Sequence, residues 1–294
     1  MTPLEQKSWG RLQGLLHLPP LPGIAARLIQ EVARPDIEIR ELAALIEQDP
    51  GLAARIVGIA NSAYFARQRP VCSVQAAITQ VLGLNLVRGI AIGITLNGPF
   101  DLAACPDFDS ERWWYQAFQT AGLCATLAPE LDLDDALRDC MFLAGLLHNL
   151  GQLVLVHAFP ARMSDIFREH RENPALALDR LETDRLAMDE HEAGAYIAHV
   201  WHLPDCIAEV MRHWKHPANA REYRPMVGTV HFCARLVEDF YENGDLPQDL
   251  EPPGDLSGID PGKVAALAER LRNTDEASRA LARELAAHRS TRVP

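Results

Sequence analysis

Residues 144–151 read A-G-L-L-H-N-L-G and lie in one of the two longest apolar runs of the chain, Phe142 to Phe159. His148, Asn149 and His157 are among the polar residues that interrupt this run. It is short for a membrane span and carries polar residues, so we interpret it as part of a helical protein core. The histidine–asparagine pair inside it is the first candidate for a functional position.

Composition favours helices. The chain has 294 residues, of which 48% are hydrophobic and only 6% aromatic. This length and apolar content suffice for one large domain or two ordinary ones. Ala, Leu and Arg are abundant, a balance that favours packed helices over sheets, whose strands prefer β-branched and aromatic residues. Helical periodicity runs through almost the whole chain, and the sequence therefore predicts an all-α protein.

Charge and cysteine usage limit the partners and the compartment. The formal net charge of −12 argues against broad binding to nucleic acid or to an anionic membrane surface. The N-terminus has no basic region followed by an apolar core, so we expect no secretory signal. The six cysteines are scattered without a C-x-x-C pair, which is typical of reduced, mostly buried thiols. We expect a cytoplasmic protein with no nucleic-acid or membrane partner.

Capping residues predict where the main helices begin. Asp49-Pro50 combines a good N-cap with a good first helical residue. Asp109 or Ser110 is expected to cap a long helix, and Asp134 or Asp135 to begin the helix that carries His148. Other helices are expected over 24–32, 37–48, 50–60, 74–81, 84–96 and 225–242, and after Pro160, Pro174 and Pro204.

Breaks between these helices suggest the domain organisation. Residues 1–100 are expected to form an N-terminal helical bundle, and residues 108–243 a second helical domain. Residues 244–262 are rich in Asp, Pro and Gly and are interpreted as a loop or linker. Residues 263–294 are expected to form a C-terminal helical extension, in two pieces because 273–275 (Asn-Thr-Asp) looks like a stop and a new cap. The apolar positions of the extension suit packing on the chain, dimerisation or a partner.

Four ordered motifs resemble the HDOD family. They are L-P-P-L-P at 18–22, L-I-E-Q-D-P-G-L at 45–52, A-N-S-A-Y at 60–64, and V-Q-A-A-I at 74–78 followed by Leu82-Gly83. Each alone is also an ordinary capping or turn sequence, but their joint order is specific. The resemblance covers roughly residues 15–240. It implies an all-helical bundle joined to a degenerate relative of the HD hydrolase domain, in a bacterial signalling protein.

The resemblance also places the metal ligands of the HD site. The stretch 144–151 is similar to the G-L-L-H-D-x-G of HD phosphohydrolases, with Asn149 in place of the metal-binding aspartate. The first histidine falls at Gln116 and the distal aspartate at Ala234, which leaves only His148. A neutral amide is a poor substitute for a carboxylate, because hard divalent cations are held mainly by anionic oxygens and imidazoles. We therefore expect an inactive HD relative without a metal or other cofactor.

Other histidines keep a metal-dependent phosphohydrolase open as the alternative. His191 lies in a segment that resembles the H-x-x-x-G of the HD-GYP relatives, and His213 stands where their H-H-E segment begins. Trp214 and Lys215 replace the second histidine and the acid. Three imidazoles, from His148, His191 and His213, can in principle hold zinc, but a lysine at the acid's position would repel a cation.

The leading functional hypothesis is a signalling scaffold that binds another protein. No G-x-S-x-G, P-loop or dinucleotide-binding motif is present. A cleft inherited from the hydrolase ancestor is a place for a small ligand, and a nucleotide second messenger is suggested by ancestry alone. A DNA-binding regulator is disfavoured by the charge and by the lack of a basic recognition helix.

Overall fold

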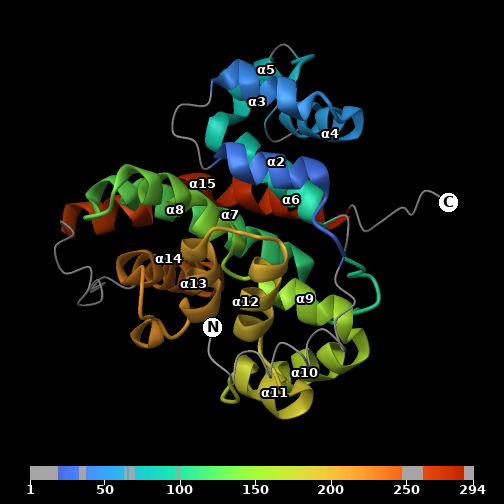
Figure 1. Cartoon of the computed structure of the whole chain (residues 1–294), viewed down its shortest axis with the longest axis vertical. Coiled ribbons are helices and arrows are strands. Elements are labelled where there is room, and N and C mark those ends of the chain that lie inside the picture. Colours follow the sequence, from blue (N-terminus) through green and yellow to red (C-terminus); the bar gives the residue numbers. More distant parts are fainter. Residues whose placement is uncertain are drawn as a thin grey trace.

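The computed structural model describes residues 19–32, 38–62, 65, 70–97, 100–246 and 261–287, and this part of the chain contains helices and no strand (Figure 1). The all-α prediction is confirmed. Helices α2–α6 gather at one end of the molecule and α10 and α11 at the other, with α7, α8 and α15 between them (Figure 1).

The N-terminal bundle is built from short amphipathic helices. These are α2 (Gly23–Val32), α3 (Ile39–Ile46), α4 (Pro50–Ala60), α5 (Val74–Ala77) with a π-helical turn (Ile78–Leu82), and α6 (Leu84–Asn97). The predicted cap is confirmed: the Asp49 carboxylate accepts hydrogen bonds from the N–H groups of Gly51 and Leu52 at 2.9 and 3.1 Å. At the other end of α4, the Asn61 amide pairs with the N–H and C=O of Val71 at 2.9 and 2.8 Å. Two of the motif residues, Asp49 and Asn61, thus have a structural role in the bundle.

The second half consists of α7 (Ser110–Leu127), α8 (Asp135–Leu147), α9 (Leu150–Ala158), α10 (Pro160–Glu172), α11 (Leu178–Leu186), α12 (Glu190–Val200), α13 (Asp205–His213) and α14 (Arg224–Asn243), with short 3-10 turns at Ala128–Glu130 and Pro217–Asn219. The predicted caps are present. Asp109 accepts from the N–H of Arg112 at 2.9 Å and Asp134 from that of Leu137 at 2.8 Å.

Two glycines of the 144–151 stretch allow its neighbours to approach. A Cβ atom on Gly145 would lie 2.7 Å from the Cα of Ala121 in α7. A Cβ atom on Gly151 would lie only 1.8 Å from the backbone oxygen of Glu190 in α12. Such distances are too short for real carbon contacts, so the close packing of α8 on α7 and of α9 on α12 requires glycine here. His148 and Asn149 are held between these two crossings.

The segment Asp135–Ala158, which joins α8 and α9, is long and apolar enough to cross a membrane by length and composition alone. However, 89% of its apolar window is buried inside the structure, as in the core helices of a folded domain. A break at His148 and Asn149 also divides it into two separate helices.

The C-terminal segment corrects one expectation. Residues Pro261–Ala287 form one continuous helix, α15, instead of two. The reason is tertiary: Thr274 bonds back to the Arg270 carbonyl at 2.8 Å and to the Gln119 side chain at 3.0 Å, and Asp275 accepts from the Tyr115 hydroxyl at 2.7 Å. Both side chains are therefore used in packing on α7 and do not cap a new helix.

Helix α15 packs within the chain. It lies along α7, and its leucines at 267, 271, 281 and 285 are buried. Near its C-terminal end, Leu285 shares a small groove with Gly58 and Ile59 of α4 and Ile94 of α6. Of the expected linker, residues 247–260 lie outside the described residues, as do residues 1–18, Ala63, Tyr64 and residues 288–294.

Candidate functional site

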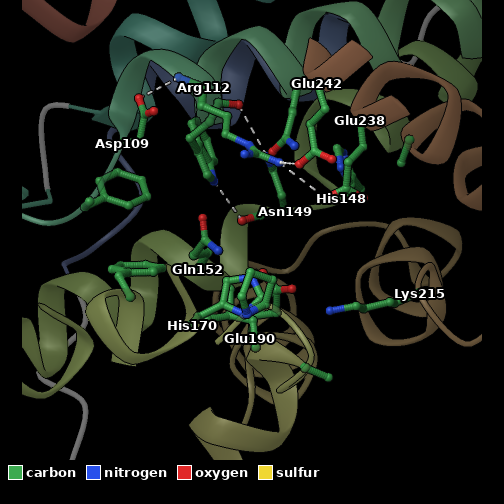
Figure 2. Close-up of a pocket in the computed structure, with 18 of the residues that line it drawn as sticks. Asp109, Arg112, His148, Asn149, Gln152, His170, Glu190, Lys215, Glu238 and Glu242 are labelled. Carbon is green, nitrogen blue, oxygen red and sulfur yellow. Dashed lines mark hydrogen bonds and ion pairs between the residues drawn. The ribbon is translucent and has the colours of Figure 1, made fainter. Parts of the chain in front are cut away.

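The four positions that the HD resemblance selected line a single cavity of about 560 Å³. Gln116 comes from α7, His148 and Asn149 from the junction of α8 and α9, and Ala234 from α14. Figure 2 shows this cavity with His148 and Asn149 beside charged residues of its wall. The structure therefore brings together residues that are up to 118 positions apart in the sequence (116 to 234).

His148 is a neutral imidazole that donates through Nδ1 and can accept through Nε2. Its side chain is only 4% exposed, and its Nδ1 lies 2.7 Å from the Gly145 carbonyl. Because a carbonyl oxygen can only accept, Nδ1 carries the proton and Nε2 keeps its lone pair. Burial lowers the pKa of His148 to about 4, with His191 contributing in the same direction, although the bond to Gly145 opposes the shift. The ring is uncharged at neutral pH.

Asn149 is tied to Trp113 by both its backbone and its side chain. The Trp113 indole N–H donates to the Asn149 carbonyl at 3.1 Å, and the Asn149 amide nitrogen faces the Trp113 carbonyl at 3.4 Å. An aspartate could not donate this second bond. The side-chain oxygen Oδ1 of Asn149 is buried and has no hydrogen-bond partner, although the residue as a whole is 5% exposed.

The indole of Trp214 occupies the space beside two candidate histidines. It packs edge-on against His148, with ring centroids 4.7 Å apart, and against His191 at 5.6 Å. His191 is buried, and neither of its ring nitrogens has a hydrogen-bond partner. The Nε2 atom of His213 instead lies 3.8 Å from a carboxylate oxygen of Glu209, and His213 does not line the cavity.

A divalent metal does not fit the donors of the cavity. Among the described residues, no three His, Cys, Asp or Glu side chains form a metal-binding group, so His148, His191 and His213 are not gathered into one. The degenerate positions themselves supply one imidazole, two carboxamides and a methyl group. That set is too weak to replace the water around a dication.

Lys215 adds a positive charge to the same wall. Its side chain is 32% exposed and lines the cavity, with Nζ 3.8 Å from the Asp179 carboxylate. Although burial opposes it, the field of Glu190, Asp179 and Glu182 raises the pKa of Lys215. The ammonium group therefore stays charged and further disfavours a metal cation.

Behind this wall lies Glu182, a fully buried carboxyl group that the sequence interpretation did not identify. Its Oε2 accepts from the N–H of Glu190 at 2.9 Å, while Oε1 has no partner. Burial, followed by the charge of Glu190, raises the pKa of Glu182 well above the ordinary glutamate value. The only signal in the sequence was an acidic residue directly after the buried Leu181 of α11.

The rim of the cavity carries an ion-pair group that sequence motifs also did not reveal. Arg112 of α7 contacts two carboxylates of α14, Glu242 at 2.7 Å and Glu238 at 3.5 Å (Figure 2). Glu238 and Glu242 are four residues apart and so share one helix face. Nothing in the sequence placed this face opposite α7.

With this all-helical fold and this degenerate HD-type cavity, the chain belongs to the HDOD family: the HDOD domain profile matches residues 18–217. The suspected family is thus confirmed. The match ends before α14, so Ala234 and the acidic pair on α14 lie beyond it.

Solved structures agree in fold. A Marinobacter aquaeolei protein, provisionally named a signal transduction protein, is 26% identical with a TM-score of 0.79 over 96% of this chain and 65% of its own. A Geobacter sulfurreducens HDOD domain protein with unknown function is 21% identical, with a TM-score of 0.72 over 96% of this chain and 97% of that one. A Shewanella amazonensis protein, provisionally named a phosphohydrolase, is 23% identical, with a TM-score of 0.69 over 97% and 98%.

A curated relative is longer than this chain. An uncharacterized protein of Treponema pallidum is 28% identical over 246 residues, which is 82% of this chain but only 45% of that protein. The chain thus spans less than half the length of this relative.

Proposed function

We propose that this chain is a non-catalytic regulatory module that acts in signal transduction by binding another protein. The observation that carries the proposal is the chemistry of the cavity. The positions of an HD metal site are together, but they hold Gln116, Asn149 and Ala234 beside a single imidazole, and Lys215 adds a cation.

A relative supports the signalling part of the proposal. The Marinobacter aquaeolei protein with a provisional signal-transduction name exceeds 25% identity and shares the fold over nearly all of this chain. Because only 65% of that protein is covered, its whole activity does not transfer. A cytoplasmic location belongs to the same proposal and is consistent with the cysteines, all unpaired and all buried except Cys72.

The alternative is a phosphohydrolase with a metal held by His148, His191 and His213. It has less support, because Trp214 packs against two of these rings and His213 is turned toward Glu209. The likeness to the Shewanella amazonensis protein, at 23% identity, is a likeness of fold.

Metal content distinguishes the two functions. The full chain should be purified without chelator or histidine tag and its metals counted by mass spectrometry. We expect less than about a tenth of an equivalent of transition metal, because one imidazole and two amides bind a dication weakly. Near one equivalent, lost on His191→Ala but kept in the control His199→Ala, would establish the alternative.

The Asn149→Asp variant tests whether restoring one metal ligand is enough to restore hydrolysis. Restoring the aspartate should not restore phosphodiesterase activity, because Gln116 and Ala234 still supply no anionic or imidazole ligand. Hydrolysis of bis(p-nitrophenyl) phosphate with added Mn²⁺ measures this. Metal-dependent turnover that appears in Asn149→Asp and is absent in the wild type would contradict the ligand count.

A further inference from the structure

The cations that line the cavity are already paired. Arg112 contacts Glu242 at 2.7 Å, Arg171 is bound to Asp107, and the ammonium of Lys215 lies 3.8 Å from Asp179. These three are the only Lys and Arg side chains among the described residues of the lining. A phosphate group would have to compete with carboxylates already in place, which makes an anionic ligand unfavourable.

Acceptors, by contrast, are in excess, although the indole N–H of Trp214 in the same lining also has no partner. Four carboxylates line the cavity, those of Asp109, Glu190, Glu238 and Glu242. Arg112 engages the last two and Asp109 caps α7, whereas Arg171 and Lys215 are paired with carboxylates outside the lining, which leaves the lining itself net acceptor-rich. In addition, Asn149 is more than nine-tenths buried, lines the cavity and has an Oδ1 atom with no donor. His148 beside it is a neutral ring held through Nδ1, which leaves the lone pair of Nε2 as a further acceptor. Buried acceptors of this kind are normally satisfied, so a ligand that donates hydrogen bonds is indicated.

The remaining walls suit a flat cation. Trp113, Trp214, Phe108 and Phe167 line the cavity, and aromatic faces attract cations, most of all guanidinium groups. A guanidinium offers five N–H donors in one plane and no acceptor. The volume of about 560 Å³ falls in the usual range for small-molecule sites and accommodates an arginine side chain with its neighbouring atoms.

We infer that this cavity binds a guanidinium group, carried by an arginine of a partner protein or by a free guanidine. The inference rests on the proposed function in one respect, since a metal in the cavity would occupy the same acceptors. It departs from the suggestion, made by ancestry alone, of a nucleotide second messenger, whose phosphates would meet a carboxylate-rich wall.

A pair of peptides of nearly the same shape, which differ in charge and in one hydrogen-bonding group, tests the inference. One peptide carries a central arginine and the other citrulline, which has the same shape but a neutral urea group. Each is titrated into the full-length chain and followed by the indole N–H resonances, because the Trp113 indole donates to Asn149 and therefore reports on the cavity. We expect the arginine peptide to bind at least about tenfold tighter, as for the loss of a charged hydrogen bond.

Further probes distinguish an arginine of a partner protein from a free guanidine and can contradict the inference. Agmatine binding to the same signals without the arginine peptide would assign the site to a free guanidine. Equal affinity for the arginine and citrulline peptides, or no binding of either peptide and of agmatine, would overturn the inference. So would tighter binding of cyclic diguanylate or inorganic phosphate at those signals.

Matched variants locate the site. Glu238→Gln, which leaves the Arg112–Glu242 pair intact, and Glu190→Gln should each weaken arginine-peptide binding about tenfold. Glu276→Gln, on the exposed side of α15, is the control and should leave it unchanged. If the chain is metal-free and inactive but shows no preference for the arginine peptide, this inference is wrong and the proposed function stands. A metal-loaded hydrolase would remove the proposed function as well.

Discussion

The motif side chains of the N-terminal bundle and the polar side chains of the HD-type cavity differ in whether their buried polar atoms have hydrogen-bond partners. In the bundle, Asp49 and Asn61 satisfy backbone groups at both ends of α4 with hydrogen bonds of 2.8–3.1 Å. In or beside the cavity, Asn149, Glu182, His191 and Trp214 all have buried polar atoms without a partner. Unpaired buried atoms also occur outside the cavity, at Arg88 of α6 for example, but only in and beside the cavity do they gather around an open space. Buried polar groups are normally paired, so this gathering marks the cavity as a place for a ligand.

The largest effect is expected where the backbone itself frames the cavity. Gly151→Ala would place a Cβ atom 1.8 Å from the Glu190 oxygen, so α9 and α12 must separate. We expect a loss of at least about 3 kcal/mol in the free energy of unfolding, the upper range for overpacking. Urea denaturation followed by circular dichroism measures it.

Gly58→Ala in α4 is the control for that substitution, because a Cβ atom there meets nothing within 4 Å. It should stabilise the chain by about 0.5–1 kcal/mol through helix propensity. Equal effects of the two substitutions would show that α9 and α12 do not approach each other as closely as the structure indicates.

A paired substitution tests the contrast between the two asparagines directly. Asn61→Leu removes two good hydrogen bonds and leaves both backbone groups of Val71 unpaired, which should lower the free energy of unfolding by about 2 kcal/mol. Asn149→Leu removes one long bond together with an unsatisfied oxygen, so less than about 1 kcal/mol should be lost. Thermal and urea unfolding of both variants give the comparison. The contrast fails if Asn149→Leu is the more damaging of the two.

The smallest effect concerns pH. The folded pKa of Glu182 is raised above its ordinary value of 4.5, mainly by burial, so the folded state holds the proton more tightly than the unfolded state. The contribution of this group to stability is therefore largest below pH 4.5 and is lost progressively as pH rises from 4.5 toward the raised pKa. Glu182→Gln is neutral at every pH and should remove this decline.

At pH 8 we expect Glu182→Gln to be more stable than the wild type by about 1 kcal/mol, with the advantage vanishing near pH 4. Urea titrations at several pH values measure the difference. Glu276→Gln, at an exposed position of α15, is the control. Parallel stability curves for wild type and Glu182→Gln would mean that Glu182 is not protonated in the folded chain.

Local signals in the sequence were sufficient for much of the fold. Asp49, Asp109 and Asp134 begin helices as expected, because a cap depends on residues within one turn. The continuity of α15 could not be predicted in this way, because Thr274 and Asp275 find their partners on α7, more than 150 positions away in the sequence. Local capping preference was outweighed there by tertiary contacts.

In the cavity, too, some residues could be predicted from local motifs and others depend on tertiary packing. Gln116, His148, Asn149 and Ala234 could be placed through a family resemblance that fixes each within a motif. The acids Glu182, Glu238 and Glu242 belong to no motif. Only the packing of α14 brings Glu238 and Glu242 to the cavity, and that of α11 places Glu182 behind its wall. Neither could the sequence show that Trp214 would lie against two histidine rings.

Helix α15 has a consequence for where this protein can be cut. Its 27 residues run about 40 Å at the usual helical rise, from the side of α7 to the groove of Leu285 beside α4 and α6. A fragment that ends with the family match at residue 217 would lack α15, whose four buried leucines pack on α7 and on the N-terminal bundle. The folding unit is therefore larger than the matched domain, and α15 adds a second connection between its two halves beside the direct packing of α2 and α6 on α8.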